Sequence, residues 1–384
     1  MALEITDITT ETKSDTFKEI MAQPRLWGET YAIIEKQIST LADFLDPILC
    51  DQQTNVILTG AGTSAYIGDV LCKVFQKHTG RITEPIATTD ILTNPKDYFS
   101  KDKKTLLVSF ARSGDSPESV GAVRLAEKLC DHISHLIITC NKDGELAKIA
   151  KDLNAYTVFM PEDSNDKALA MTGSFTSMLL AGILISDLKN LAKNKGYVDQ
   201  LVGYGNSMLE KDQEIKQIAQ LDFNRAVFLG SGPLKGIARE SQLKLQELTD
   251  GLVICKYDSF LGLRHGPKAV IDKYTLVVYL LSNDTYISQY ELDLVRSING
   301  SEDKMAEVGV GQNLPQLKEV NLNLTISSGK ANQLPEEYFA VCAVLPGQLL
   351  GFYKSLALGL SPDSPSVNNA INRVVQGVNI YPYQ

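Results

Sequence analysis

The sequence predicts an α/β protein of two tandem domains, each a parallel sheet flanked by helices in three αβα layers, as in flavodoxin or Rossmann folds. Three observations predict it. The chain has 384 residues, which is enough for two domains of ordinary size. Short, continuously apolar runs alternate with helix-length segments, which is typical of parallel strands with both faces covered. A unit of strand, Gly-x-Gly and helix occurs twice.

The first half carries most of these elements. The first sixty residues are predicted to be helical, with an apolar face from Leu26 to Leu49. Apolar strands are expected at 55–59, 105–110, 136–140 and 156–160, and helices at 64–78, 117–129 and 168–191. We predict an N-terminal helical segment at 1–45 and a first domain at 46–195.

The second half repeats the opening of the first. GAGTSAYIG at 60–68 resembles GSGPLKGIA at 230–238, and each follows an apolar strand and begins a helix. A further apolar strand is expected at 275–281. This similarity favours duplication of one α/β unit over two unrelated domains that share a turn type. The second domain, with a C-terminal tail, is predicted at 215–384, after a helical connection at about 195–221.

Composition excludes some classes of function. The net charge is −9, which argues against non-specific nucleic-acid binding because that needs a basic face. The N-terminus is polar and acidic, unlike a signal peptide. The longest apolar runs, near 177–185 and 340–350, are short or interrupted by Pro346. Six scattered cysteines without a CxxC motif indicate reduced thiols, and we expect a cytoplasmic protein without membrane contact.

Two further readings concern metals and nucleotides. His132 and His135 have metal-like spacing, but two histidines alone do not make a zinc site, so no metal and no cofactor are expected. Gly60, Gly62 and Ala65 fit a loose dinucleotide fingerprint, with Asp90 near the end of a second strand. That alternative stays open, although nothing downstream resembles a site of hydride transfer.

Hydroxyl side chains follow the predicted strands of the first half. They are Thr63 and Ser64, then Ser113 and Ser116, and finally Thr172 with Ser174. Loops after parallel strands meet at the carboxyl edge of a sheet, where helix N-termini and hydroxyls can hold a phosphate. The alternative is that Ser113 and Ser116 only cap the helix that starts at Pro117.

A second set of polar residues lies on the helix after Gly232. Glu240, Lys244 and Glu247 are spaced i, i+4, i+7 and therefore share one face. A solvated ladder of ion pairs is the ordinary explanation. The loop that follows contains His265 among Gly and Pro residues, so a histidine and a carboxylate could form an acid/base pair.

Four motifs in order give a family resemblance: GAGTS at 60–64, RSGDSPES at 112–119, ESQLKLQEL at 240–248 and RHGP at 264–267. From about residue 20 to the end, the chain resembles the sugar isomerase (SIS) domain family, with two tandem SIS domains. More narrowly, it is similar to the isomerase half of glucosamine-6-phosphate synthase and to the AgaS group. That group comprises tagatose-6-phosphate ketose/aldose isomerases and galactosamine-6-phosphate deaminases. The segment at 372–378 is also typical of it.

The resemblance implies roles at matching positions. Ser64, Ser113 and Ser116 would bind phosphate, and Glu247 would move a proton between C1 and C2. Lys244 would lie one turn before that base, and His265, from a partner subunit, would open the sugar ring. The full predicted substrate-binding set is Thr63, Ser64, Arg112, Ser113, Ser116, Thr172 and Arg373.

The chain departs from the synthase in three places. Ala111 and Met171 stand where the synthase has hydroxyls, and the C-terminal tail offers Arg373 in place of a catalytic lysine. The resemblance is to the isomerase half alone, so we do not expect this chain to make ammonia from glutamine.

The resemblance therefore implies conversion of galactosamine 6-phosphate to tagatose 6-phosphate and ammonia by a homodimer or dimer-based oligomer. A plain aldose–ketose isomerase of a hexose 6-phosphate and a non-catalytic sugar-phosphate-binding regulator stay open as alternatives. The sequence does not separate the galacto from the gluco epimer.

Overall fold

The computed structural model describes residues 11–300, 303–314, 320–326, 333–368, 370–373, 375 and 377–384. The chain forms two compact units. Unit A comprises Arg25–Asp166, Met171–Val198 and Ile371–Gln384, so the C-terminal tail belongs to it. Unit B comprises the described parts of Met1–Pro24, Lys167–Ala170 and Asp199–Ala370. The limits of the two predicted domains stay a prediction.

Unit A is built on one parallel sheet with the strand order β2-β1-β3-β4-β5. Its strands are β1 (Asn55–Thr59), β2 (Thr83–Pro85), β3 (Thr105–Ala111), β4 (Ile133–Thr139) and β5 (Ala155–Phe159). Every residue of β3 is buried, as expected for a central strand covered on both faces.

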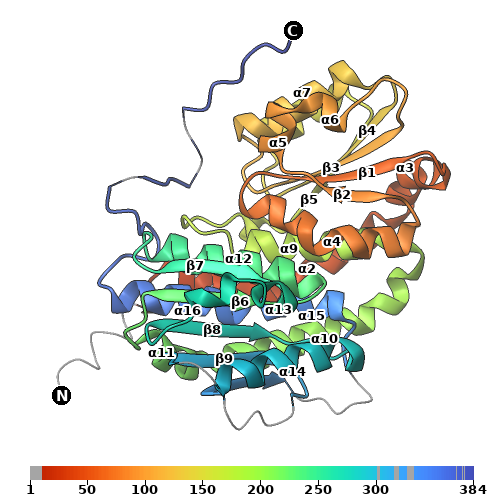
Figure 1. Ribbon diagram of the computed structural model, residues 1–384. Helices are drawn as coiled ribbons and strands as arrows, with labels where there is room; N and C mark the ends of the chain where they lie inside the picture. Colours follow the sequence, from red (N-terminus) through yellow and green to blue (C-terminus); the bar gives the residue numbers. More distant parts are fainter. Residues whose placement is uncertain are drawn as a thin grey trace. The chain divides into compact units, whose positions relative to one another are not determined.

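Helices cover both faces of this sheet (Figure 1). They are α3 (Ile38–Cys50), α4 (Thr63–Thr79), α5 (Thr88–Thr93), α6 (Pro95–Tyr98), α7 (Pro117–Leu129), α8 (Glu145–Ile149) and α9 (Gly173–Ser186). On one face, α5 and α7 pack on the strands through a core that includes Ile91, Leu107 and Val123. On the other, α4 packs against α9, all of whose residues are buried. Helices α2 (Asp15–Lys36) and α10 (Leu191–Leu209) carry the chain from one unit to the other.

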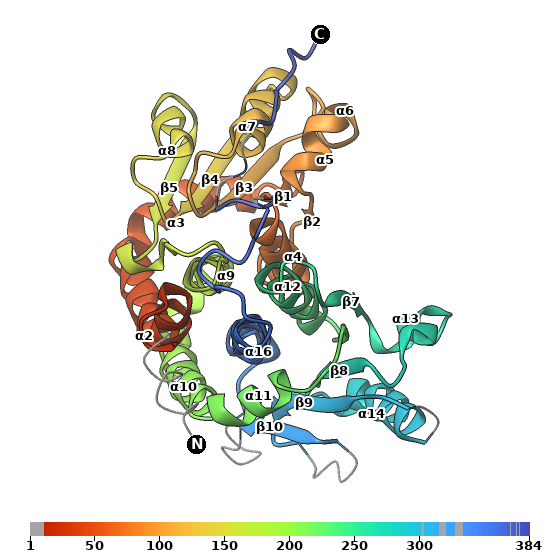
Figure 2. The ribbon, with the colours of Figure 1, turned by 90° about the vertical axis from the view of Figure 1, so that its left-hand side faces the viewer.

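Unit B contains a second parallel sheet, in the order β10-β9-β8-β6-β7. Its strands are β6 (Arg225–Leu229), β7 (Ile254–Asp258), β8 (Thr275–Leu280), β9 (Ala306–Gln312) and β10 (Leu322–Ile326). Its helices are α11 (Asp212–Ala219), α12 (Pro233–Leu248), α13 (Phe260–Leu263), α14 (Thr285–Asn299), α15 (Glu336–Ala343) and α16 (Leu345–Ala357). Helices α13 and α14 lie on one side of the sheet and α11, α12 and α16 on the other (Figure 2).

The two sheets have the same topology. Numbered in chain order within each unit, both read 2-1-3-4-5, the order of flavodoxin-like sheets. In both, the glycine that ends the Gly-x-Gly turn has nearly the same backbone angles, φ 56° and ψ −129° at Gly62, and φ 52° and ψ −130° at Gly232. The shared strand order and turn geometry support the duplication inferred from the sequence.

Several expected elements differ in extent. The helix predicted at 168–191 is α9, and residues 168–172 are not helical because Asp166 accepts the first backbone N–H groups of the helix. The prediction missed β2, β7, β9 and β10. Strand β2 has three residues, and β7 is a half-exposed edge strand, so neither shows a continuous apolar run.

Among the described residues, one helical stretch is long and apolar enough to cross a membrane, unlike the expectation from the sequence. It is Glu336–Ala357, α15 and α16 together, in which an 18-residue window has a mean hydropathy of 1.3, but 94% of that window is buried inside the fold. Its apolar character is therefore explained by the core of unit B. The bent pair Gly173–Ser186 and Leu188–Leu209 is also long and apolar enough to cross a membrane when counted as one span, with an angle of 88° between its parts.

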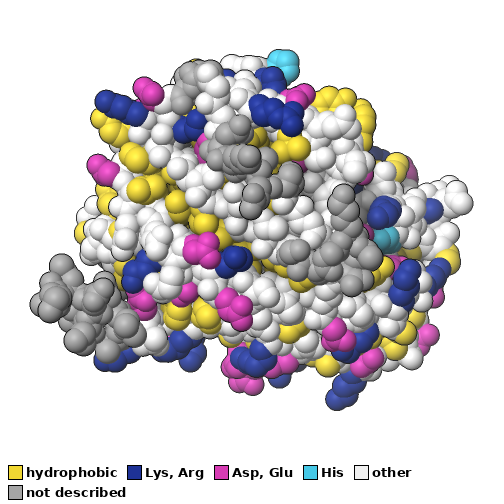
Figure 3. Space-filling view, turned by 90° about the horizontal axis from the view of Figure 1, so that it is seen from below, with side chains coloured by type: hydrophobic (Ala, Val, Ile, Leu, Met, Phe, Trp, Pro, Cys, Tyr) yellow, Lys and Arg dark blue, Asp and Glu magenta, His cyan; other side chains and the backbone are white. Residues whose placement is uncertain are grey.

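On the face drawn in Figure 3, basic and acidic side chains are interspersed.

Candidate active site

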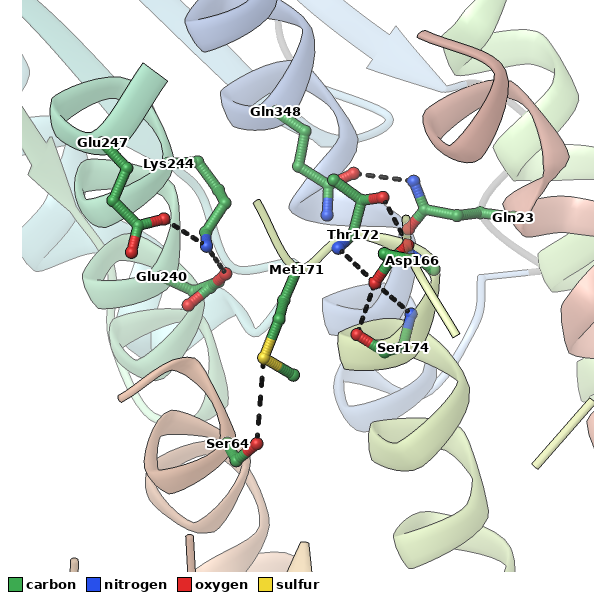
Figure 4. A network of polar contacts seen from close by, with 11 residues as sticks. Gln23, Ser64, Asp166, Met171, Thr172, Ser174, Glu240, Lys244, Glu247 and Gln348 are labelled. Atoms are coloured by element: carbon green, nitrogen blue, oxygen red, sulfur yellow. Dashed lines mark hydrogen bonds and ion pairs between the residues drawn. The ribbon is translucent and has the colours of Figure 1, made fainter. Parts of the chain in front are cut away.

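The first hydroxyl loop of unit A lies at the start of α4. Helix α4 begins at Thr63 directly after the Gly62 turn, and no side chain caps its N-terminus. Thr63 and Ser64 are both buried, and the Ser64 hydroxyl lies 3.9 Å from the sulfur of Met171 (Figure 4). An uncapped helix N-terminus with adjacent hydroxyls is suited to an anion.

The second loop, after β3, separates its two serines by role. Ser116 caps α7: its hydroxyl accepts the backbone N–H of Ser119 and donates to the Ser119 hydroxyl at 2.7 Å. Ser113 does not cap the helix. Its hydroxyl accepts the backbone N–H of Asp115 at 3.2 Å, which leaves its proton to donate to a ligand. The capping alternative therefore holds for Ser116 and not for Ser113.

The third loop places an internal carboxylate at the start of α9. The buried Asp166 accepts the backbone N–H groups of Thr172, Gly173 and Ser174 and the hydroxyls of Thr172 and Ser174 (Figure 4). Thr172 thus lies where it was expected, but its hydroxyl proton is directed to Asp166. A carboxylate at this helix N-terminus takes the position that an anionic ligand would need. Sequence analysis missed Asp166, although an acidic residue shortly before a Thr/Ser pair is a signal for capping.

Arg112 and Arg373 meet in unit A. The buried Arg112 donates to the backbone carbonyl of Arg373. The Arg373 guanidinium in turn donates to the carbonyl of Asp166 at 2.9 and 2.6 Å and to Asn165 at 3.0 Å. These bonds tie the C-terminal tail to the phosphate-loop arginine and to the loop before α9.

The polar face of α12 in unit B is a buried triad of Glu240, Lys244 and Glu247. The Lys244 ammonium lies 3.3 Å from Glu240 and 2.7 Å from Glu247 (Figure 4). Glu240 and Lys244 side chains are 0% and 1% exposed, whereas 24% of Glu247 is exposed. The interpretation of this face as solvent-exposed ion pairs is therefore wrong. Of the three side chains, Glu247 is the one that a ligand can reach.

Close packing explains this burial. Helix α16 lies against α12, and a Cβ added at Gly347 or Gly351 would come within 2.5 Å of Ser241 or 3.0 Å of the Lys244 carbonyl. Only glycine allows the two helices to approach so closely. Burial acts to lower the pKa of Lys244, but Glu240 and Glu247 outweigh it and hold that pKa above its usual value. Lys244 is thus a permanent cation.

His265 forms no bond to the Glu240, Lys244 and Glu247 side chains of α12 within the described residues. It follows α13, whose first turn is capped by Ser259, and its side chain is exposed. No hydrogen bond or ion pair joins His265 to Glu247 within the part of the chain that the structure describes. Within the described residues these two side chains therefore form no hydrogen-bonded pair, and the predicted acid/base pair stays a prediction.

The structure also bears on the rival sites. Asp90 lies in α5, exposed, and not at the end of β2, where a dinucleotide site needs its carboxylate. The His135 ring is buried and lies 2.8 Å from Glu127, and burial lowers the pKa of His135 against the opposing effect of that carboxylate. A partner of this kind explains the histidine without a metal.

The chain is similar to a known domain family and to named proteins. Residues 48–185 match the SIS domain, so the chain is an SIS-domain protein. It is 41% identical over 376 residues to the D-galactosamine-6-phosphate deaminase AgaS of Shewanella sp. (strain ANA-3), covering 96% of this chain and 92% of the relative. The protein of that name from Escherichia coli O157:H7 is 37% identical, with 96% of each chain covered. The chain belongs to the AgaS family of SIS-domain proteins.

A solved structure supports the same assignment. The tagatose-6-phosphate ketose/aldose isomerase from Escherichia coli is 34% identical, with a TM-score of 0.88 and 98% of each chain covered. The resemblance derived from the four motifs is confirmed, and so is the fold class of two helix-flanked parallel sheets.

Proposed function

We propose that this chain converts galactosamine 6-phosphate and water to tagatose 6-phosphate and ammonia. The observation that carries the proposal is the buried triad on α12, in a chain whose relatives are named for this reaction. A carboxylate that a ligand can reach can act as a general base.

The chemistry needs only proton transfers and one addition of water. His265 relays a proton to open the pyranose ring, and the resulting aldehyde acidifies the proton on C2. Glu247 removes that proton, and reprotonation at C1 gives a ketimine at C2. Water then adds to the ketimine and releases ammonia, which leaves the ketose. The Lys244 cation offsets the negative charge that develops as C2 loses its proton.

In this proposal the loops of unit A bind the phosphate group. Ser64 and Thr63 at the uncapped start of α4 and the free proton of Ser113 supply donors. Ser116 supports the loop as a helix cap, Arg112 and Arg373 order the tail, and Thr172 acts through Asp166. The predicted substrate-binding set thus divides into donors and supporting residues.

The decisive experiment measures ammonia and ketose from purified protein with galactosamine 6-phosphate and, in parallel, glucosamine 6-phosphate. We expect equal amounts of ammonia and tagatose 6-phosphate from the first substrate and much slower turnover of the second. Interconversion of hexose 6-phosphates without ammonia release from the amino sugar would establish the plain isomerase instead. No turnover of any of these sugars, with binding retained, would favour a regulator.

We further propose that the active form is a homodimer or dimer-based oligomer. The exposed side chain of His265, for which the described part of the chain shows no bond to Glu247, supports this arrangement. Mixing inactive Glu247→Gln protein with inactive His265→Ala protein should then restore partial activity. If subunits exchange and no activity returns, both residues act within one chain.

We place the reaction in the cytoplasm. All six cysteines are free thiols, as is usual in a reducing compartment. A fusion with a fluorescent protein that localised outside the cytoplasm would contradict this.

A further inference from the structure

The Gly-x-Gly turn of unit B has the geometry of the turn in unit A but different chemistry. In both turns the first glycine allows a close approach that no side chain could share. A Cβ on Gly60 would lie 2.6 Å from the Ser64 backbone, and one on Gly230 would lie 2.3 Å from the Leu234 carbonyl oxygen. These close approaches and the matching angles at Gly62 and Gly232 show that the two turns have the same backbone geometry.

The donors of the first turn are missing from the second. Thr63 and Ser64 of unit A correspond to Pro233 and Leu234 of unit B, which occupy the same two positions after the turn. Proline has no N–H group and neither residue has a hydroxyl, so the start of α12 lacks the two hydroxyl groups that follow the turn in unit A.

The loop after the neighbouring strand, β3 in unit A and β8 in unit B, also differs in its side chains. Thr59 is in register with Ser109 in unit A, and Leu229 is in register with Tyr279 in unit B. Three residues further along each strand, Arg112 of unit A therefore corresponds to Ser282 of unit B. Ser282 serves two carboxylates: its hydroxyl donates to Glu336, and its backbone N–H donates to Glu291 at 2.9 Å.

Both carboxylates lie at the turn. A Cβ added at Gly232 would lie 3.5 Å from an oxygen of Glu336, and the Ser231 hydroxyl is a neighbour of Glu291, which is 0% exposed. Burial raises the pKa of Glu291 to about 7 and also raises the pKa of Glu336. The turn of unit B is thus flanked by the buried Glu291 and the half-buried Glu336, whereas hydroxyl residues follow the turn of unit A.

We propose that unit B retains a closed copy of the phosphate-binding turn, in which the Glu336 and Glu291 carboxyl groups occupy the place of a phosphate. The comparison rests on the proposed phosphate site of unit A. Because α12 carries Glu240, Lys244 and Glu247, the closed turn fixes the helix that holds the candidate base.

Chemical rescue tests the closed turn without an activity assay. Glu336→Ala should lower the melting temperature, and sodium formate should restore at least half of the loss, relative to sodium chloride at equal ionic strength. Formate supplies the missing carboxylate to the vacated position. Glu337→Ala, changed at the next residue, is the matched control and should show no specific recovery. Absence of rescue, or equal rescue of both variants, would overturn the proposal.

Equilibrium dialysis of the unaltered protein with inorganic phosphate gives a second test that needs no variant to fold. The proposal predicts one bound phosphate per chain, lost in Ser64→Ala. Two phosphates per chain, or one that Ser64→Ala leaves unchanged, would overturn the closed copy. No bound phosphate at all would count against the proposed site in unit A, while formate rescue would still decide the fate of unit B.

Discussion

The start of α4 in unit A and the start of α12 in unit B share one turn geometry but carry different side chains. Neither start is capped by a side chain, and the first is followed by hydroxyls, with Arg112 on the adjacent loop. The second is followed by Pro233 and Leu234 and is flanked by Glu291 and Glu336. A duplicated fold has thus kept the backbone of the turn and exchanged neighbouring hydroxyl groups for carboxyl groups.

The difference has a physical reason in the proposed reaction. A phosphate group is repelled by nearby carboxylates, whereas abstraction of a C2 proton needs one. A single copy of the turn could therefore not serve both phosphate binding and proton abstraction. In the proposed reaction, unit A would supply neutral donors for binding, and unit B would supply Glu247, which lies 2.7 Å from the Lys244 ammonium.

The largest effect should come from the base on α12. Glu247→Gln keeps the shape of the side chain but cannot accept a proton, so turnover should fall about 10²–10⁴-fold. Binding of the sugar phosphate should change little because the phosphate donors lie in unit A. Exchange of the C2 hydrogen with deuterated water should also stop. Near-normal turnover and exchange in this variant would refute the proposed division of roles.

Glu240→Gln is the contrasting change on the same helix face. Turnover should fall much less than in Glu247→Gln because Glu240 is 0% exposed and cannot reach a substrate. Stability should fall by about 3 kcal/mol, since one carboxylate of a buried ion pair is removed. Urea denaturation and steady-state kinetics separate the two effects. A loss of turnover equal to that of Glu247→Gln would make Glu240 part of the chemistry.

The closed turn should make stability depend on pH. The pKa of Glu291 is raised from 4.5 to about 7 by burial, so the folded protein binds this proton more tightly than the unfolded chain. Its contribution is complete below pH 4.5 and is lost as the pH rises through 7. Relative to Glu291→Gln, the unaltered protein should lose about 3 kcal/mol of unfolding free energy across that window.

Urea denaturation of both proteins between pH 4 and about 8 measures this difference. Glu337→Gln is the control and should keep the pH dependence of the unaltered protein. If Glu291→Gln also keeps it, the buried acid of the turn is not the group that titrates.

The smaller effects belong to the serine loop of unit A. Ser113→Ala removes a hydrogen bond to a charged group, worth about 1.5–3 kcal/mol, so the Kd of a sugar-phosphate analogue should rise roughly 10- to 150-fold. Its melting temperature should hardly change. Ser116→Ala should do the reverse: it removes the cap of α7 and lowers stability by about 1 kcal/mol, with little change in Kd. Calorimetry of both variants would show whether capping and binding are separate; identical behaviour would contradict the separation.

The sequence by itself determined the features that depend on local pattern. Strand β1 and helix α7 have the bounds expected from it, because continuous apolar runs, Gly-x-Gly turns and a Ser-Pro start are signals within a few residues of the elements they define. The spacing that puts Glu240, Lys244 and Glu247 on one helix face is equally local. Four motifs in order were enough for the family.

Only the tertiary structure decided how those residues are used. The same helical spacing fits a solvated ladder or a buried triad, and the choice was made by Gly347 and Gly351, about a hundred residues away, which let α16 close over Lys244. Glu336 reaches the Gly232 turn from a similar separation along the chain. Burial depends on which distant segments pack together, and periodicity within one segment carries no information about its neighbours.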